Sequence, residues 1–491
     1  MFYLNERPLL QSSFFFYVGK ATLTINSGKA LTVTDSIQNE AGTSGIEVKS
    51  DVSGTASLIH EAAQIDATVE HYIPKYVGAA GWHYISSPIV TQAIQPEFVA
   101  NPPYSSDDFY KFSEPEYLWL SVKDNSGNWN ESFEDDFVVG CGYNVAFAEN
   151  ETKSFTGELN AGDFTFNTST TPAITYTADG GIGWNLMGNP YPSGLDWDQC
   201  GRTNIDASVY AYDGDAGQYV SWNGSIGALN GGIIPAMNAF FIKASANSEL
   251  TIPNDARTHA ANNFYKEKDY VEDLLVLKVE GNGFSDKTFI HFNADASNEY
   301  DSDFDAYKLS GIFEAPQLYT KAGDSKLSIN VLPYTIKEIT IPLCLKVGAE
   351  TEYKISVSEN TFWETVDISL KDLETGNLYD LRTQTSFTLN HEPNNSSDRF
   401  LILINGATGL EENKIEDDGI EIYAYGNQIF IKTNGEGEAQ VSVYNLLGQT
   451  IASRTLTGLG TLSEFRIDKP SFYLVLVRTD ETRKVKKVFV R

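Results

Sequence analysis

The segment that comes nearest to a catalytic metal motif is His60-Glu61-Ala62-Ala63-Gln64. A zinc metallopeptidase helix places a second histidine four residues after the first, and glutamine is a poor zinc ligand at that position. The sequence contains no Gly-x-Ser-x-Gly nucleophile motif, and no glycine-rich phosphate loop precedes a helix. We therefore expect no catalytic residues and predict that the protein is not an enzyme.

Three alternating aspartates, Asp301, Asp303 and Asp305, form the best candidate for a metal site. Calcium takes six to eight oxygen ligands, and carboxylates supply them. An EF-hand loop requires glycine at its sixth position and glutamate at its twelfth, where this chain has Ala306 and Ile312. The sequence thus excludes an EF-hand and leaves two readings open: a calcium site of another kind, or aspartates that cap turns. We expect no other cofactor.

The formal net charge of −31 restricts the classes of partner. Binding to nucleic acid requires a basic surface, so we expect no nucleic-acid partner and no docking on anionic lipid. The charge favours solubility, and clustered carboxylates that bind cations are the alternative. No stretch reaches the roughly 18 apolar residues of a membrane-spanning helix. The three cysteines, Cys141, Cys200 and Cys344, fit no metal-binding spacing, and one disulfide, such as Cys141 with Cys200, is the most they allow.

The residue composition predicts strands. The chain has 26 Tyr, 28 Phe and 39 Gly, and such aromatic residues favour strands while glycines supply turns. A chain of 491 residues is too long for a single core, at roughly 100–200 residues per domain. We predict an all-β protein built of tandem β-sandwich modules.

Four regions follow from the pattern along the chain. Residues 1–75 have strands of about four residues separated by small residues, which is typical of β-solenoid rungs, and they read as the truncated or misplaced start of a longer protein. Residues 266–408 have the short strands and turns of a β-sandwich. An acidic linker then opens the last region, residues 409–491, in which six or seven strands indicate a compact sandwich.

Residues 76–265 contain an internal repeat. Residues 81–88 (Gly-Trp-His-Tyr-Ile-Ser-Ser-Pro) resemble residues 183–190 (Gly-Trp-Asn-Leu-Met-Gly-Asn-Pro), and a second pair of similar strands follows at residues 142–147 and 236–242. We interpret the region as a duplicated β-rich module in which the tryptophans anchor cores. The alternative is that aromatic rings of this region stack on sugars. The candidate rings are Trp184, Tyr191, Trp197, Tyr210, Tyr212, Tyr219 and Trp222.

The C-terminal region carries three motifs in order: a Tyr-Asn-Leu-Leu-Gly-Gln turn, a strand around a tyrosine, and a basic final strand. Residues 478–491 hold six basic and two acidic residues, a local reversal of sign on an acidic chain. A receptor can recognise such a contrast, and a solvated edge strand guarded by lysines is the structural alternative. The residues of the three motifs are Tyr444, Asn445, Leu446, Leu447, Gly448, Gln449, Tyr473, Lys484, Lys486, Lys487 and Val488.

These motifs resemble the type A C-terminal sorting domain of proteins exported by the type IX secretion system of Bacteroidetes. One departure is Ser471-Phe472, where the family usually has glycine. The resemblance implies an immunoglobulin-like β-sandwich that is read by the type IX outer-membrane machinery and removed by its sortase. It also implies that the cargo is secreted or held at the outer cell surface, where lipopolysaccharide or glycans are further partners.

The sequence thus leads to two hypotheses for residues 1–408. The first is a non-enzymatic protein of adhesion or surface display. The second is the carbohydrate-binding accessory portion of a larger secreted enzyme that degrades polysaccharides.

Overall fold

The computed structural model confirms the all-β class: the described residues form strands and four short 3-10 helices, and no α-helix. It describes the chain except residues 1, 4–10, 13–15, 35, 79, 101–107, 261–270, 335–338, 363–365, 406–419, 426, 434–437, 446–448, 458–461, 468, 470, 480–482 and 491. Two compact units, Met1–Gly409 and Leu410–Arg491, divide the chain. Among the described residues, no helix has the length and apolar character needed to cross a membrane.

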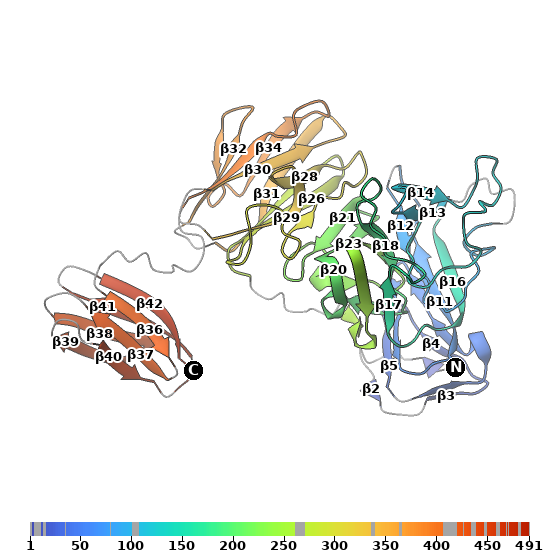
Figure 1. The fold of residues 1–491 in the computed structure, drawn as a ribbon, viewed down its shortest axis with the longest axis horizontal. Helices are drawn as coiled ribbons and strands as arrows, with labels where there is room; N and C mark the ends of the chain where they lie inside the picture. The colour runs from blue at the N-terminus through green and yellow to red at the C-terminus, as the bar shows by residue number, and fades with distance from the viewer. Residues whose placement is uncertain are drawn as a thin grey trace. The chain divides into compact units, whose positions relative to one another are not determined.

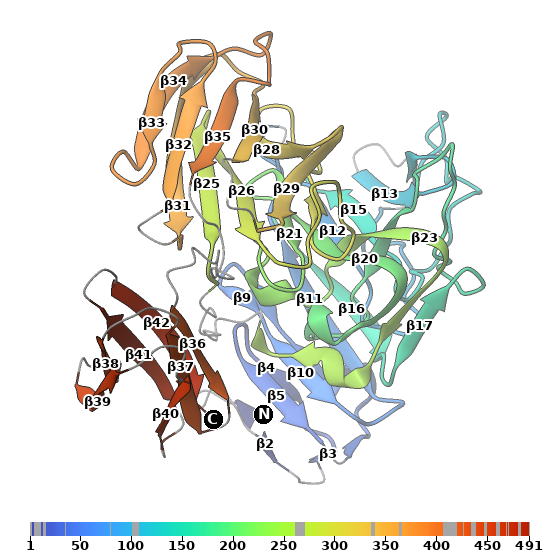
Figure 2. The ribbon, with the colours of Figure 1, turned by 60° about the vertical axis from the view of Figure 1, so that its left-hand side comes forward.

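The first unit begins with a parallel β-solenoid, as the short strands predicted (Figure 2). Successive rungs stack in parallel on three faces, and β11 ends the first face by pairing antiparallel with β16. The strands are β1 (Phe2–Tyr3), β4 (Leu23–Ile25), β7 (Ile46–Val48), β11 (Asp66–Ile73) and β16 (Glu151–Glu158) on the first face, β2 (Gln11–Ser12), β5 (Ala30–Val33) and β10 (Ser57–His60) on the second, and β3 (Phe16–Val18) and β6 (Ile37–Asn39) on the third. The turn after β7 holds the short pair β8 (Ser50–Asp51) and β9 (Gly54–Thr55).

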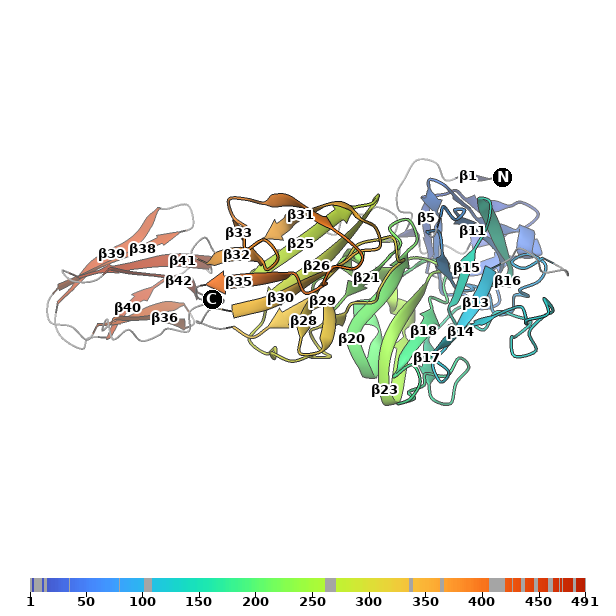
Figure 3. The same ribbon diagram turned by 90° about the horizontal axis from the view of Figure 1, so that it is seen from above.

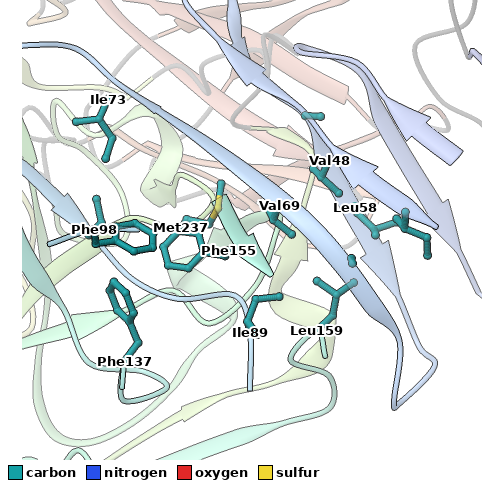
Figure 4. Packing of buried hydrophobic residues seen from close by; sticks show 14 of the residues in the cluster. Val48, Leu58, Val69, Ile73, Ile89, Phe98, Phe137, Phe155, Leu159 and Met237 are labelled. Carbon is teal, nitrogen blue, oxygen red and sulfur yellow. The ribbon is translucent and has the colours of Figure 1, made fainter. Parts of the chain in front are cut away.

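One hydrophobic core joins the solenoid to the strands that follow it. Leu58 and Val69 of the solenoid pack in the same cluster as Phe98 and Phe155 (Figure 4). The rings of Phe98 and Phe155 lie 4.6 Å apart, and both residues are fully buried. The cluster extends from Val18 to Leu159 and also takes in Met237. Residues on both sides of position 75 therefore share a single core.

Two antiparallel sheets form most of the repeat region. The first sheet has the order β12 (His83–Ile85), β15 (Tyr143–Ala146), β13 (Asp108–Ser113) and β14 (Leu118–Ser121). The second has the order β17 (Phe164–Asn167), β23 (Ala239–Ile252), β20 (Gly201–Asp213) and β21 (Gln218–Trp222), with β18 (Trp184–Gly188) also on β23 (Figure 1). The same region of the chain also forms a small sheet in the order β22 (Ile233–Ile234), β19 (Gly194–Asp196) and β24 (Arg257–Thr258). Its 3-10 helices are η2 (Trp197–Gln199), η3 (Asn230–Gly232) and η4 (Asn254–Ala256).

The two copies of the repeat pair with each other. Ile85 of the first copy bridges to Asn238 of the second, and Met187 of the second bridges to Cys141 of the first. The Ser86 hydroxyl donates to the Asn189 carbonyl at 2.6 Å. The repeated segments thus meet along the line where the copies join.

A single long sheet forms the rest of the first unit, and its two end strands pack against each other through side chains. Its order is β33 (Leu378–Asp380), β32 (Asp367–Asp372), β35 (Phe400–Asn405), β30 (Ile339–Lys346), β28 (Gln317–Ala322), β29 (Ser325–Leu332), β26 (Phe284–Phe292), β25 (Leu274–Gly281), β31 (Thr351–Asn360) and β34 (Ser386–His391), with β27 (Ala306–Tyr307) on β29. Tyr379 of β33 and Phe387 of β34 stack with ring centroids 4.0 Å apart, so strands from the two ends of the sheet meet around one core.

The second unit is a β-sandwich of two sheets (Figure 3). One has the order β36 (Ile420–Tyr425), β37 (Gln428–Thr433) and β40 (Leu462–Arg466). The other has the order β39 (Thr450–Thr457), β38 (Glu438–Asn445), β41 (Ser471–Arg478) and β42 (Arg483–Val490). Alternate residues such as Val441 and Val475 fill the core between the sheets, which is the pattern expected of a sandwich.

Candidate functional site

The three aspartates predicted as a metal site lie in the turn before β27. Asp305 is fully buried, and its two carboxylate oxygens accept from the backbone N–H groups of Val331 at 2.7 Å and Asp301 at 2.9 Å. The Asp301 carboxylate in turn accepts from the N–H of Asp303 at 3.1 Å. Burial raises the pKa of Asp305 to about 7. In the described part of the chain, no group of three or more His, Cys, Asp and Glu side chains is arranged to hold a metal ion.

His60 and Glu61 make structural contacts. His60 is fully buried, and its Nδ1 lies 2.8 Å from the Ala62 carbonyl. Glu61 forms an ion pair of 2.8 Å with Arg257, whose guanidinium also donates to the His60 carbonyl. The three cysteines are free, so the disulfide between Cys141 and Cys200 is not formed.

The predicted sorting motifs come together in the second unit. Asn445 at the end of β38 pairs with Tyr473 of β41, and Tyr473 pairs with Val488 of β42. The Asn445 side chain also closes a turn with Gln449, accepting from its N–H at 2.9 Å and donating to its Oε1 at 2.8 Å. Tyr444 precedes this turn on β38. Leu446, Leu447 and Gly448 lie outside the described residues.

The basic strand β42 is at the end of its sheet. Lys484 and Lys486 are half-buried and share a strand face with the buried Val488, since residues two apart point the same way. Val485 on the opposite face is 53% exposed. The side chain of Lys487 lies outside the described part. An edge strand with unpaired backbone groups and lysines is open to a partner strand or protein, and lysines also guard such edges against aggregation.

An open groove lined with aromatic rings lies in the first unit. We call it the aromatic groove; its volume is about 400 Å³. Its lining residues are Trp82, Tyr84, Tyr110, Trp119, Asn144, Tyr212, Tyr219, Ser310, Gly311 and Ile312. Ligand sites of this kind have volumes of about 300–1,000 Å³ and combine apolar walls with a few polar groups.

One wall of the aromatic groove is a face of the first repeat sheet. Tyr84, Asn144 and Tyr110 lie in one row across β12, β15 and β13, and side chains in such a row share a face. Trp82, which lies just before β12, also lines the groove. The rings of Trp82 and Tyr110 meet edge to face, 5.8 Å apart, and the Tyr110 hydroxyl donates to Asp108 at 3.1 Å.

The hairpin of β20 and β21 supplies the second wall. Tyr212 and Tyr219 face each other across this hairpin. Tyr212 stacks on Tyr84 at 5.2 Å, and the hydroxyls of Tyr84 and Tyr219 lie 2.5 Å apart. Burial raises the pKa of Tyr212 to about 12 and that of Tyr84 well above its usual value. These hydroxyls therefore stay neutral at physiological pH.

A loop of the long sheet module supplies the third wall. The N–H of Ile312 donates to the Gly217 carbonyl in the β20–β21 turn at 2.8 Å. The Gln218 side chain donates to the Pro316 carbonyl at 2.6 Å. A Cβ on Gly311 would overlap with the Gly217 carbonyl oxygen, so glycine permits this close approach. The loop is thus fixed to the hairpin by hydrogen bonds.

The polar groups of the aromatic groove are few and uncharged. The Oδ1 of Asn144 is buried and accepts no hydrogen bond from a described residue. The indole N–H groups of Trp82 and Trp119 likewise donate to no residue that the structure describes. Charged side chains are absent from the lining but present nearby: Asp108 beside Tyr110, and Asp213 beside Tyr212.

Most of the rings predicted as a sugar platform are core residues. Tyr191, Trp197 and Tyr210 are at most 1% exposed, and Trp184 packs between Tyr210 and Phe241. Tyr212 and Tyr219 of that set do line the aromatic groove. The sequence pattern predicts Trp82 as a core anchor, with a ligand-stacking platform as the alternative. Tyr84, Tyr110 and Trp119 are not among the predicted rings, although the alternation of Trp82 with Tyr84 signals an aromatic strand face.

A larger cavity of about 680 Å³ lies where the loop after β21 meets β25 and β26. Trp222, Phe289 and Val276 line it, together with the glycine-rich loop after β21. The Trp222 indole donates to Asp198 at 3.0 Å. We call it the Trp222 cavity. Of the described residues that line it, Trp222 is the one half-buried aromatic residue, whereas several half-buried rings line the aromatic groove.

Comparisons with known proteins identify a family without a known function. Residues 16–403 match the family described as a domain of unknown function, DUF8693. No curated protein matches the chain. A solved structure, the BSP domain of a biofilm associated protein, is 10% identical with a TM-score of 0.13; the match covers 86% of this chain and 63% of that one, and such a score carries no argument about function. Because the family match covers most of the sequence, the chain belongs to the DUF8693 family.

Proposed function

We propose that this protein is a non-enzymatic secreted or cell-surface protein, exported by a type IX secretion system through residues 410–491 and acting in adhesion or surface display. One observation carries the proposal: Asn445, Tyr473 and Val488, from the three motifs of the sorting resemblance, lie in one row of a compact unit separate from the rest of the chain. A separate unit can be recognised and removed without disturbing the core of the cargo.

The proposed partners are the type IX outer-membrane machinery and its sortase. Lys484 and Lys486 lie on the edge strand β42, whereas the chain as a whole has a formal net charge of −31. A basic edge on an acidic protein gives a receptor a charge contrast to recognise.

The test is a secretion assay of the full-length chain, placed behind a signal peptide in a host with a type IX system. We expect the protein at the surface or in the medium, and the Lys484→Glu/Lys486→Glu double variant in the periplasm. The matched control is Lys469→Glu, which changes the charge of an exposed lysine in the same unit. Equal export of the double variant and the parent would show that the basic strand has no role in export. Retention of the parent and both variants in the periplasm would refute type IX export.

A second candidate function is carbohydrate binding, as the accessory portion of a larger polysaccharide-degrading enzyme. The aromatic groove favours it, since half-buried Trp and Tyr rings present apolar faces with polar edges. A glycan array with the purified full-length protein tests this function independently of secretion, and the absence of binding to every glycan would refute it.

A further inference from the structure

We propose that the aromatic groove is a binding site for an uncharged glycan, with Trp82 and Tyr110 as the stacking surface and Asn144 as the hydrogen-bonding group on the floor. This inference rests on the carbohydrate-binding candidate function and assigns it to a site, a ligand class and named residues.

The rings of the groove differ in their exposure. Trp82, Tyr110 and Trp119 are half-buried, whereas the tyrosine of β12, Tyr84, is 5% exposed and holds the wall together. Sugar rings have apolar C–H faces that can cover such aromatic surfaces, while their hydroxyls point to the sides. The edge-to-face contact of Trp82 and Tyr110 leaves two differently inclined surfaces at the same wall.

Polar groups of the lining lack partners. A buried polar atom without a partner costs free energy, so a ligand group or a water that pairs with the Asn144 Oδ1 is favoured. Trp82 and Trp119, whose indole N–H groups are donors, line the same groove. A hydroxyl both donates and accepts, and therefore matches this mixture.

A proline-rich peptide is the main alternative occupant, because aromatic grooves also bind such segments. Proline has no backbone N–H, so a polyproline helix offers carbonyl acceptors and few donors. Such a ligand satisfies the indole donors and leaves the Asn144 oxygen unpaired. The unpaired acceptor thus favours the glycan.

The charge around the groove favours an uncharged ligand. The described lining contains no lysine, arginine or histidine, while the Asp108 carboxylate accepts from the hydroxyl of the lining Tyr110. Uronic acids, sulfated sugars and phosphates would meet negative charge without a cation to pair with. Like-charge contacts of this kind discriminate against a ligand. The groove therefore selects neutral sugars.

The walls of the groove are held rigidly. The contacts of Ile312 with Gly217 and of Gln218 with Pro316 fix the loop against the hairpin. The hydroxyl contact of Tyr84 with Tyr219 fixes the hairpin against the first sheet. A site whose walls are set before binding loses less conformational entropy when the ligand arrives.

The experiment measures binding of the full-length protein to an array of neutral oligosaccharides, uronic acid oligosaccharides and a proline-rich peptide, followed by calorimetric titration of the best ligand. We expect the best ligand to be a neutral oligosaccharide. Trp82→Ala should weaken its affinity about tenfold or more, in line with about 1.4 kcal/mol per factor of ten. Asn144→Ala should weaken it about 2- to 10-fold, the range for one neutral hydrogen bond.

Trp222→Ala is the matched control, since Trp222 is also half-buried but lines the other cavity. We expect this variant to bind as the parent does, and thermal unfolding checks that all three variants are folded. If a neutral glycan binds and Trp222→Ala alone abolishes binding, the site is the Trp222 cavity and the assignment to the aromatic groove is wrong.

The remaining outcomes separate the two proposals. Glycan binding that survives Trp82→Ala and Asn144→Ala would keep the carbohydrate function and overturn the site. Preference for uronic acid oligosaccharides would overturn the ligand class. Binding of the proline-rich peptide but no glycan, or binding of nothing, would overturn both the site assignment and the carbohydrate function, and would leave the secretion proposal unaffected.

Discussion

Ser86 and Gly188 hold equivalent positions in the two copies of the repeat, 102 residues apart in the sequence, and they face each other where the copies meet. A Cβ on Gly188 would overlap with the Cβ of Ser86 and lie 2.6 Å from the carbonyl oxygen of Cys141. The carbonyl belongs to the backbone and cannot rotate away. Glycine in one copy thus makes room for serine in the other.

We therefore expect Gly188→Ala to destabilise the first unit by about 3 kcal/mol, the upper end of the range for overpacking a core. Calorimetric unfolding of the full chain measures the effect. Gly201→Ala is the comparison, since its nearest neighbour would be the Thr251 side chain at 3.3 Å, and it should cost well under half as much. Equal stability of Gly188→Ala and the parent would show that the copies do not pack as closely as described.

The ion pair of Asp372 and Arg399 gives a second prediction. Two hydrogen bonds of 3.1 and 2.9 Å join the side chains, and both residues are buried. We expect Asp372→Ala to cost about 3–5 kcal/mol, because it leaves the guanidinium without this buried partner. Glu149→Ala, which breaks an exposed pair of 3.7 Å with Lys75, should cost less than about 1 kcal/mol. Similar losses in urea unfolding for the two variants would contradict this prediction.

Acid should weaken the first unit through three histidines. Burial lowers the pKa of His60, His71 and His259 to about 4, from 6.5. The folded state disfavours the protonated forms, so their contribution to stability is complete above pH 6.5 and is lost as the pH falls through 4. Each shift corresponds to at most about 3 kcal/mol. The free energy of unfolding between pH 7 and 4 measures the loss.

His259→Gln supplies the control for this pH dependence. His259 lies between the hydroxyls of Thr32 and Ser57, at 2.8 and 2.7 Å, and glutamine keeps a polar group there without a titration. The variant should lose less stability on acidification than the parent. Asp305, with its pKa raised to about 7, acts in the opposite direction and becomes more favourable to folding as the pH falls. An unchanged slope in His259→Gln would contradict the assignment.

Ligand affinity at the aromatic groove should be independent of pH between about 6.5 and 9. None of its lining residues titrates in this range, since burial raises the pKa of Tyr84 and Tyr212 and burial together with Asp108 raises that of Tyr110. Titrations at several pH values measure this. An affinity that follows a group with a pKa between 7 and 8 would show that a residue outside the described lining takes part.

Local pattern predicted the elements well and the groove poorly. Short strands between small residues predicted the solenoid, and alternation predicted strands such as β25 and β38, because these signals lie within a few residues of each other. The aromatic groove joins Trp82, Tyr219 and Ile312, which only long-range pairing brings together. No spacing along the chain carries that information.

Sequence pattern likewise does not tell which aromatic rings are buried and which are exposed. Tyr210 and Tyr212 are two residues apart on β20, yet Tyr210 is a core residue and Tyr212 lines the groove. What separates them is the neighbour across the sheet interface: the Tyr210 hydroxyl accepts from the N–H of Tyr307 at 2.9 Å, beneath the long sheet module. Composition identifies such rings as candidates, and packing decides between them.

The loop wall formed by Ile312 has a mechanical consequence. The ligand would touch chain segments near positions 82, 212 and 312, so an occupied groove fastens the repeat region to the long sheet module. Binding to the folded state alone adds free energy that unfolding must overcome. If such a protein is held at a surface by its ligand and pulled by flow, the bound ligand would strengthen the junction between the repeat region and the long sheet module. Single-molecule stretching would then measure a higher unfolding force with ligand bound than without it.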